Sequence, residues 1–228
     1  MSPRVIVFDV NETLLDLSAL DHHFQHAFGN AVARQEWFAQ LLRSAMIATL
    51  TNTYHDFTTL AGAALDMVAA RREVHLSANT RAGILDQMRH LPPHPEVQVS
   101  LERLHDAGLR LAALTNSAPA AAEAQLSNAG LKEFFEQIIS VDAVKRYKPA
   151  PEPYRWAAER LGVNIGDMRL VAAHDWDVAG AMKAGCKAAF VARPGMVLNP
   201  LMPQPDIIGK DLAEVTQRLL EIDARDER

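Results

Sequence analysis

Four segments of the sequence carry side chains that can do chemistry, and they follow one another in a fixed order. The first ends in Asp9, the second in Thr115 and Asn116, the third carries Lys148 and the fourth carries Asp177. A carboxylate can act as a nucleophile, bind a metal or cap a turn, and a nearby lysine lowers its pKa through the opposite charge. Each residue alone has an ordinary structural explanation, but the four segments together indicate a catalytic site.

The strands that would carry these residues are marked by apolar runs. Residues 5–8 are Val, Ile, Val and Phe, as expected for a strand buried on both faces of a parallel sheet. Strand and helix patterns alternate after residue 108, which is typical of βαβ units. Because parallel strands present their carboxyl ends at one edge of a sheet, we expect the four segments to converge there. The expected strands lie at residues 4–8, 109–115, 137–141, 169–173 and 188–192, and the expected helices at 119–128, 153–161 and 178–184.

Residues 16–95 interrupt this alternation with helical patterns. Apolar residues recur at helical spacing from Trp37 through Leu41 to Ala45, and again from Leu60 to Val68. The segment closes with the proline-rich sequence LPPHP at 91–95. These patterns predict a core made of residues 1–15 and 96–228, with a helical cap made of residues 16–95 inserted after the first strand.

Composition and charge exclude several classes of function. The 228 residues are 49% hydrophobic with a formal net charge of −5, so we expect no nucleic-acid partner. No apolar run reaches the roughly 18 residues of a membrane-spanning helix, so we expect no membrane partner. The single cysteine, Cys186, and an N-terminus without a signal-peptide core predict a cytoplasmic protein.

The order of the four segments resembles the haloacid dehalogenase (HAD) superfamily, and the resemblance covers almost the whole chain. It implies an α/β fold, a Rossmann-like three-layer core around a parallel sheet, with an inserted helical cap domain. It also implies that Asp9 is the nucleophile, that Thr115 supplies a hydroxyl, and that Lys148 and Asp177 complete the site.

Within this superfamily, the sequence departs from the members that transfer phosphoryl groups with magnesium. Those members place a second aspartate two residues after the nucleophile as a general acid, and Asn11 stands there. They also hold the metal with a Gly-Asp pair shortly before the last acidic residue, where this chain has Ala172 and Ala173. A methyl group cannot bind the hard magnesium ion, which needs oxygen ligands. We therefore expect neither a metal nor another cofactor.

The departures instead resemble the metal-free type II 2-haloacid dehalogenases. The matching features are the six-residue spacing of Lys148 and Tyr154, the Trp176–Asp177 pair, the Tyr54-x-x-Phe57 pattern in the cap, and Thr13, four residues after the nucleophile.

This resemblance implies hydrolytic dehalogenation of haloacetates and (S)-2-haloacids to 2-hydroxy acids. Asp9 would attack carbon 2 and expel halide, giving an ester that water then hydrolyses. Thr13 and Lys148 would orient and stabilise the Asp9 carboxylate, and Asp177 would position Lys148 and activate the water, with a contribution from His174. The residues expected to bind the small haloacid substrate are Asn11, Thr115, Asn116, Tyr154, His174, Trp176 and Phe57.

Three departures from the dehalogenase pattern stand near the expected pocket. Phe38 occupies the position of an arginine in the first cap helix, with Arg43 further along the chain as a candidate replacement. Glu12 stands in place of a glycine, and His174 in place of an asparagine. Two alternatives remain open from the sequence: a magnesium-dependent phosphatase of the same superfamily, and a degenerate member that acts as a binding protein.

The cap helix around residues 41–50 has more apolar residues than one buried stripe needs. Packing within the cap and a homodimer through the cap explain this surplus equally well.

Overall fold

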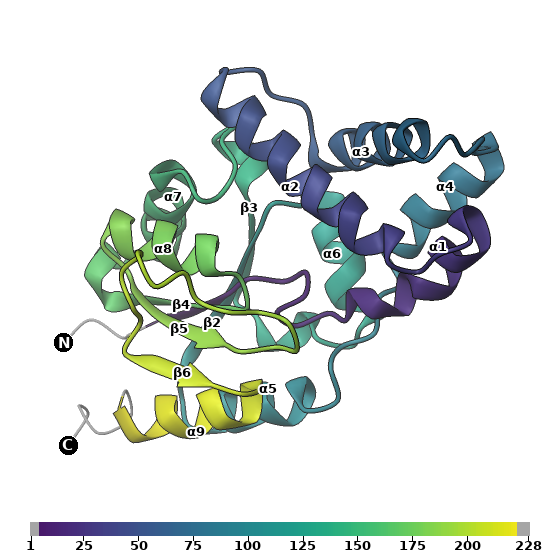
Figure 1. The fold of residues 1–228 in the computed structure, drawn as a ribbon. Helices are drawn as coiled ribbons and strands as arrows, with labels where there is room; N and C mark the ends of the chain where they lie inside the picture. The colour runs from purple at the N-terminus through teal and green to yellow at the C-terminus, as the bar shows by residue number, and fades with distance from the viewer. Residues whose placement is uncertain (1–4, 223–228) are drawn as a thin grey trace.

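The computed structural model describes residues 5–222, and within them six parallel strands form one sheet in the order β3-β2-β1-β4-β5-β6 (Figure 1). The strands pair in continuous register, with Phe8 opposite Ala113 on one side and Val171 on the other. β1, β2, β4 and β5 are almost entirely buried, in agreement with their apolar sequences. The strands are β1 (Val5–Phe8), β2 (Arg110–Thr115), β3 (Gln137–Ser140), β4 (Met168–Ala172), β5 (Lys187–Val191) and β6 (Ile207–Gly209).

Helices cover both faces of this sheet. On one face α5 (Val97–Asp106) packs beside α9 (Leu212–Ile222), and on the other α7 (Pro151–Leu161) packs beside α8 (Asp175–Ala184) (Figure 1). α6 (Pro119–Asn128) packs against β3. The predicted three-layer α/β core is therefore confirmed.

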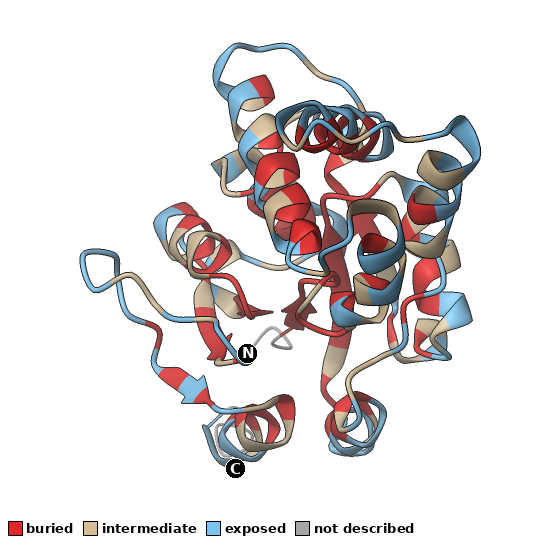
Figure 2. Cartoon of the chain, turned by 45° about the vertical axis from the view of Figure 1, so that its right-hand side comes forward, coloured by how far each residue is buried: buried red, intermediate tan, exposed pale blue. Residues whose placement is uncertain are grey.

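The segment between β1 and α5 is built from helices that stand beyond the carboxyl edge of the sheet (Figure 1). Their buried sides face one another and the core (Figure 2). Trp37 shows how tightly they pack, because its ring is fully buried and its indole nitrogen donates to the carbonyl of Ala61 at 2.9 Å. The helices are η1 (Leu17–Leu20), α1 (Asp21–Phe28), α2 (Ala33–Leu50), α3 (Phe57–Arg71) and α4 (Ala78–Gln87).

Polar contacts fasten the end of α2 and the loop after it to the core. The Tyr54 hydroxyl donates to the carboxylate of Asp142 at 2.6 Å, and Arg146 donates to the carbonyl of Thr49 at 2.7 Å. The Tyr54 ring also stacks on the ring of Tyr147, at 5.3 Å between centroids. These contacts set where the cap helices lie over the sheet edge.

The strand order places Asp9 at a point where ligands bind in this class of fold. The order reverses between β1 and β4, and the crevice beyond the carboxyl ends of the strands at such a reversal is the usual ligand site. Asp9 directly follows β1, and His174 follows β4 two residues after its end.

Two features of the C-terminal region differ from the sequence predictions. α8 begins at Asp175 rather than at residue 178, so Trp176 and Asp177 lie in its first turn. The strand Ile207–Gly209, which pairs with β5 before α9 begins, was not among the strands expected from the sequence. The charged end at 223–228 lies outside the described residues. None of the helices within residues 5–222 has the length and apolar character needed to cross a membrane.

Candidate active site

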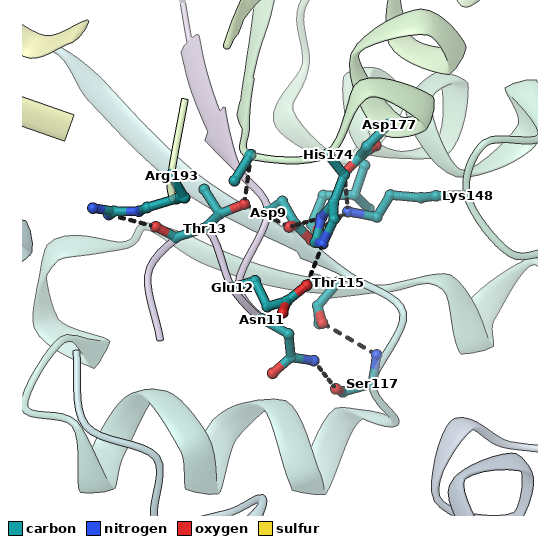
Figure 3. Close-up of polar contacts among 12 residues, drawn as sticks. Asp9, Asn11, Glu12, Thr13, Thr115, Ser117, Lys148, His174, Asp177 and Arg193 are labelled. Carbon is teal, nitrogen blue, oxygen red and sulfur yellow. Dashed lines mark hydrogen bonds and ion pairs between the residues drawn. The ribbon is translucent and has the colours of Figure 1, made fainter. Parts of the chain in front are cut away.

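The carboxylate of Asp9 lies at the centre of the site, with partners on both of its oxygens (Figure 3). The residue is 5% exposed. Its Oδ1 accepts a hydrogen bond from Lys148 Nζ at 2.8 Å. Its Oδ2 accepts one from Thr13 Oγ1 at 2.7 Å and lies 3.1 Å from His174 Nδ1. The backbone N–H of Asp9 donates to the carbonyl of Val171 at 3.0 Å, which ties the start of this loop to β4.

Thr13 holds the turn that follows the nucleophile candidate. Its hydroxyl accepts from the backbone N–H of Ala173 at 2.9 Å while donating to Asp9. Its carbonyl accepts from Arg193 at 2.8 Å (Figure 3). The turn is therefore fixed both to β4 and to the segment after β5, and Asp9 keeps one orientation.

Lys148 is fully buried, yet all three N–H groups of its ammonium have acceptors. They donate to Asp9 Oδ1 at 2.8 Å, to Asp177 Oδ2 at 2.6 Å and to the carbonyl of Leu114 at 2.9 Å. A charge can stay buried when it is paired and hydrogen-bonded in this way. Burial alone would lower the pKa of Lys148, but the carboxylates of Asp177 and Asp9 raise it, so the lysine remains charged.

Asp177 is bonded on both oxygens and is fully buried. Lys148 donates to Oδ2, and the hydroxyl of Tyr154 donates to Oδ1 at 2.6 Å. This geometry indicates that Asp177 positions Lys148 rather than activates water. It also corrects the expectation that Tyr154 binds the substrate, because its hydroxyl is directed to Asp177 and the residue is fully buried. Burial and the charge of Asp177 raise the pKa of Tyr154 well above its usual value, so it donates as a neutral phenol.

His174 lies between two carboxylates. Its Nδ1 is 3.1 Å from Asp9 Oδ2 and its Nε2 is 2.9 Å from Glu12 Oε2. Burial alone would lower the pKa of the imidazole, but hydrogen bonds to Asp9 and Glu12 raise it to about 10. The ring therefore carries both protons and a positive charge at neutral pH. It stacks on Trp176 at 4.9 Å and faces Phe38 at 6.2 Å between centroids.

These surroundings keep Asp9 ionised. Burial alone would raise the pKa of its carboxyl group, but the charges and hydrogen bonds of Lys148 and His174 outweigh burial and hold it well below its usual range. A buried carboxylate with no proton and a fixed orientation is suited to nucleophilic attack.

The amide and hydroxyl side chains near Asp9 mostly hold loops together. Thr115 Oγ1 accepts from the N–H of Ser117 at 3.1 Å, and Asn116 Oδ1 accepts from the N–H of Lys148 at 3.1 Å. Asn11 donates to the hydroxyl of Ser117 at 3.3 Å. The loops after β1, β2 and β3 are therefore linked to one another around Asp9.

Two cavities flank this group of loops. One, of 580 Å³, is lined by Phe38, His174 and Trp176. The other, of 290 Å³, is lined by Phe57 and Ser117. The predicted pocket residues Trp176 and Phe57 thus line different cavities, each of which lies between the cap and the core.

A family model described as a haloacid dehalogenase-like hydrolase matches residues 3–185. The chain belongs to this family. It is 31% identical over 204 residues to an (S)-2-haloacid dehalogenase of Pseudomonas sp. (strain YL), with 88% of each chain covered. It is 33% identical over 200 residues to (S)-2-haloacid dehalogenase 4A of Burkholderia cepacia, with 85% of each covered. The L-2-haloacid dehalogenase of Xanthobacter autotrophicus, solved with chloropropionic acid covalently bound, has a TM-score of 0.89 at 26% identity and covers 96% of this chain and 99% of its own.

Two charged residues of this haloacid dehalogenase-like site were not predicted from the sequence to belong to it. Glu12 was recognised only as a departure from glycine, although its carboxylate contacts His174. Arg34 is 8% exposed, pairs with Asp21 and lies 3.7 Å from Glu12. The spacing of Arg34 could have predicted its place in the site, since Arg34 precedes Phe38 by one helical turn and lies on the same face of α2.

Arg43 does not take the place of the missing arginine. Its side chain donates to Gln40 and lines a surface pocket with Ile47 and Met67, on another part of the cap. The cavity beside His174 is lined by Arg34 and Phe38 instead.

A divalent metal does not fit this haloacid dehalogenase-like site. The Lys148 ammonium stands between the two carboxylates that would have to share a cation, bonding to Asp9 and Asp177 at 2.8 and 2.6 Å. Ala172 and Ala173 offer only methyl groups near that edge of the sheet. The reaction below therefore has no step that goes through a metal.

Proposed function

We propose that this protein hydrolyses the carbon–halogen bond of short 2-haloalkanoic acids, namely haloacetates and (S)-2-haloacids, to give 2-hydroxy acids. The observation that carries the proposal is the buried Asp9 carboxylate, which Thr13, Lys148 and His174 hold, while Ala173 stands where a metal-dependent member would supply a second metal-binding carboxylate. The relatives named above are (S)-2-haloacid dehalogenases, and one structural neighbour holds chloropropionic acid covalently.

In the first step the Asp9 carboxylate attacks carbon 2 of the substrate from the side opposite the halogen. The new carbon–oxygen bond forms as the carbon–halogen bond breaks, and halide leaves with the bonding electrons. Carboxylates are weak nucleophiles, so the step needs an ionised, aligned and desolvated group. Burial of Asp9 and its hydrogen bonds to Thr13 and Lys148 support this requirement.

In the second step water adds to the Asp9 side-chain carbonyl, and the bond between that carbon and the ester oxygen breaks. Lys148 stabilises the negative charge that develops on the carbonyl oxygen. Carbon 2 is untouched in this step, so one inversion remains and an (S)-haloacid gives an (R)-2-hydroxy acid. The water oxygen enters the carboxyl group of Asp9.

For substrate binding we propose that the remaining predicted residues act through the two cavities. Trp176 and Asn116 would lie on the side of the leaving halide, and the loop of Thr115 would bind the substrate carboxylate. Phe57 and Asn11 would limit the length of the acid. The aromatic lining by Phe38 and Trp176 supports an apolar surface for the halogen.

The proposed activity is tested by halide release from chloroacetate, bromoacetate, fluoroacetate and the two 2-chloropropionate enantiomers, each with and without EDTA. We expect release from haloacetates and from one enantiomer, unchanged by EDTA. The parallel assay uses p-nitrophenyl phosphate with magnesium. Phosphate release that EDTA abolishes, without halide release, would instead establish a phosphatase, and inactivity in both assays would favour a binding protein.

We further propose that the enzyme works in the cytoplasm as a homodimer joined through the cap. Two apolar residues on α2 support a cap interface, because Ile47 is 51% exposed and Leu50 is 84% exposed. Replacing both with lysine should shift the mass measured by light scattering after size exclusion from dimer to monomer. The matched control is Val99→Lys on α5, where a 59% exposed valine lies on the core. A wild-type monomer, or a dimer that survives the double change, contradicts this interface.

A further inference from the structure

A chain of charges runs from the buried Arg34 on α2 to the nucleophile through His174. Arg34 lies 3.7 Å from Glu12, Glu12 lies 2.9 Å from His174 Nε2, and His174 Nδ1 lies 3.1 Å from Asp9 (Figure 3 shows Glu12, His174 and Asp9). Asp9 and His174 are each 5% exposed. His174 helps to keep Asp9 ionised, but neither His174 nor Glu12 has a part in the two bond-changing steps described above.

The backbone of Glu12 is shaped to present its carboxylate to this histidine. Its φ angle is +62°, in the left-handed region that side chains rarely adopt. The conformation is held by a hydrogen bond from its N–H to the carbonyl of Leu15 at 2.9 Å, and its own carbonyl lies 3.1 Å from His94 Nε2. Strained residues that persist in this way are concentrated at functional sites.

We propose that His174, held by Glu12, is the base of the ester-hydrolysis step, and that alkylation of Asp9 is the event that turns it into a base. This inference rests on the proposed function, because it needs the ester to form. It gives His174 two successive roles: a charged partner of the free carboxylate, then a proton acceptor for the hydrolytic water.

The change in charge on Asp9 supplies the switch. In the free enzyme two carboxylates hold the proton on the imidazole, which raises the pKa of His174 to about 10 against the effect of burial. In the ester Asp9 is neutral, so one of the two anions is gone while burial remains. The Nδ1 proton then leaves, and its lone pair faces the carbon that water attacks. The hydrogen bond from Nε2 to Glu12 keeps the ring in that tautomer.

Protons balance over the hydrolysis step. The imidazole gives its Nδ1 proton to solvent when the ester forms, and it then takes one proton from the attacking water. As the tetrahedral intermediate collapses, that proton passes to the leaving alkoxide and yields the hydroxy acid. The new carboxylic acid of Asp9 then gives its own proton to His174, and the resting ion pair returns.

The other titratable groups near the ester are less suited to this task. Asp177 has both oxygens bonded, to Lys148 and to Tyr154, and is fully buried. In the ester Lys148 still pairs with Asp177 at 2.6 Å, and the ordinary pKa of a lysine lies far above that of an imidazole, so it stays charged. The charged groups that face His174 from the elements around it are Asp9 after β1, Glu12 in the following turn, Arg34 on α2, Asp175 at the start of α8, and Lys148 across Asp9.

The first test separates the two steps in the His174→Gln variant. Rapid-quench assays with chloroacetate should still show halide release of about one equivalent per site, while steady-state turnover falls about 10²-fold or more. Mass spectrometry of the quenched variant should show Asp9 accumulating as the ester. Turnover at the wild-type rate, or slow halide release without an ester, would overturn the inference. A wild-type enzyme that releases no halide would overturn the proposed function as well.

The second test needs no activity. The Asp9→Asn variant has a neutral side chain in place of the carboxylate and so imitates the charge of the ester. NMR titration of the His174 ring should show its pKa falling from about 10 in the wild type to below about 7, near the ordinary histidine value. An unchanged His174 titration in this folded variant would contradict the switch.

Glu12 acts through His174 and is a positioning residue, so its test is a pH profile. The Glu12→Gln variant keeps a hydrogen-bond acceptor but loses a charge that raises the pKa of His174. The acid limb of kcat should therefore move to lower pH, with a lower plateau because the weaker base accepts a proton less readily. The matched control is Glu136→Gln, which breaks a surface pair with Arg110 and should leave the profile in place. A limb that does not move would exclude Glu12 from this role.

Discussion

Halide release by the Asp9→Asn variant should be lower than that of the wild type by at least about 10⁴-fold, as expected when a covalent nucleophile is removed. The amide nitrogen has no lone pair available for attack on carbon, and the neutral side chain no longer pairs with Lys148 and His174. The loss should appear in kcat at saturating chloroacetate. The thermal melt, followed by circular dichroism, should confirm that the variant is folded.

Oxygen-18 water gives the companion measurement on the wild type. A single turnover in labelled water should put the label in Asp9, because water attacks the side-chain carbonyl and not carbon 2. The first hydroxy acid released should be unlabelled. Label in that first product would mean direct attack of water on the substrate, and Asp9 would then be a base rather than a nucleophile.

The second large effect is expected for Lys148→Met, on both stability and turnover. Methionine fills a similar volume but leaves the carboxylates of Asp9 and Asp177 buried side by side without their cation. Breaking a buried ion pair by removing one partner costs about 3–5 kcal/mol. We therefore expect the free energy of unfolding to fall by about that amount in urea denaturation, and halide release to be lost because the pKa of Asp9 rises.

The matched control for this change is Lys183→Met, at the exposed end of α8. It removes the same charge from the surface, where the expected change in stability is within about 0.5 kcal/mol. If Lys148→Met unfolds at the same urea concentration as the control, the ammonium does not stabilise the two carboxylates in the folded protein.

The strands of the sheet could be predicted from the sequence wherever a strand is a buried apolar run. Residues 5–8 are fully buried in β1, and the segment around 169–173 forms β4 within one residue of its expected bounds. β6 was missed because Ile207–Gly209 is three residues long and lies at the sheet edge, which leaves no periodic pattern to detect. The start of α8 was placed too late because His174 caps that helix without a side-chain hydrogen bond.

The contacts among Asp9, Lys148 and Asp177 followed from the sequence because parallel strands bring their ends together. The hydrogen bond from Tyr154 to Asp177 could not be predicted from the sequence. Sequence spacing does not show whether a residue near a helix start faces the pocket or the helix behind it. Arg34 was overlooked for a related reason. A charged residue on a helix is usually solvated, and only tertiary packing reveals that this one is buried against the cavity.

The side chains that hold Asp9 in the folded chain, Thr13, Lys148 and His174, all come from the sheet edge, whereas Phe38 and Phe57 come from the inserted helices. The nucleophile and the surface that selects the acid thus lie on different parts of the chain, and each can be changed without the other. Laboratory evolution confined to α2 and α3 should change which haloacids are accepted while Asp9 and the side chains that hold it stay intact. A library of variants for this purpose should therefore begin with these two helices.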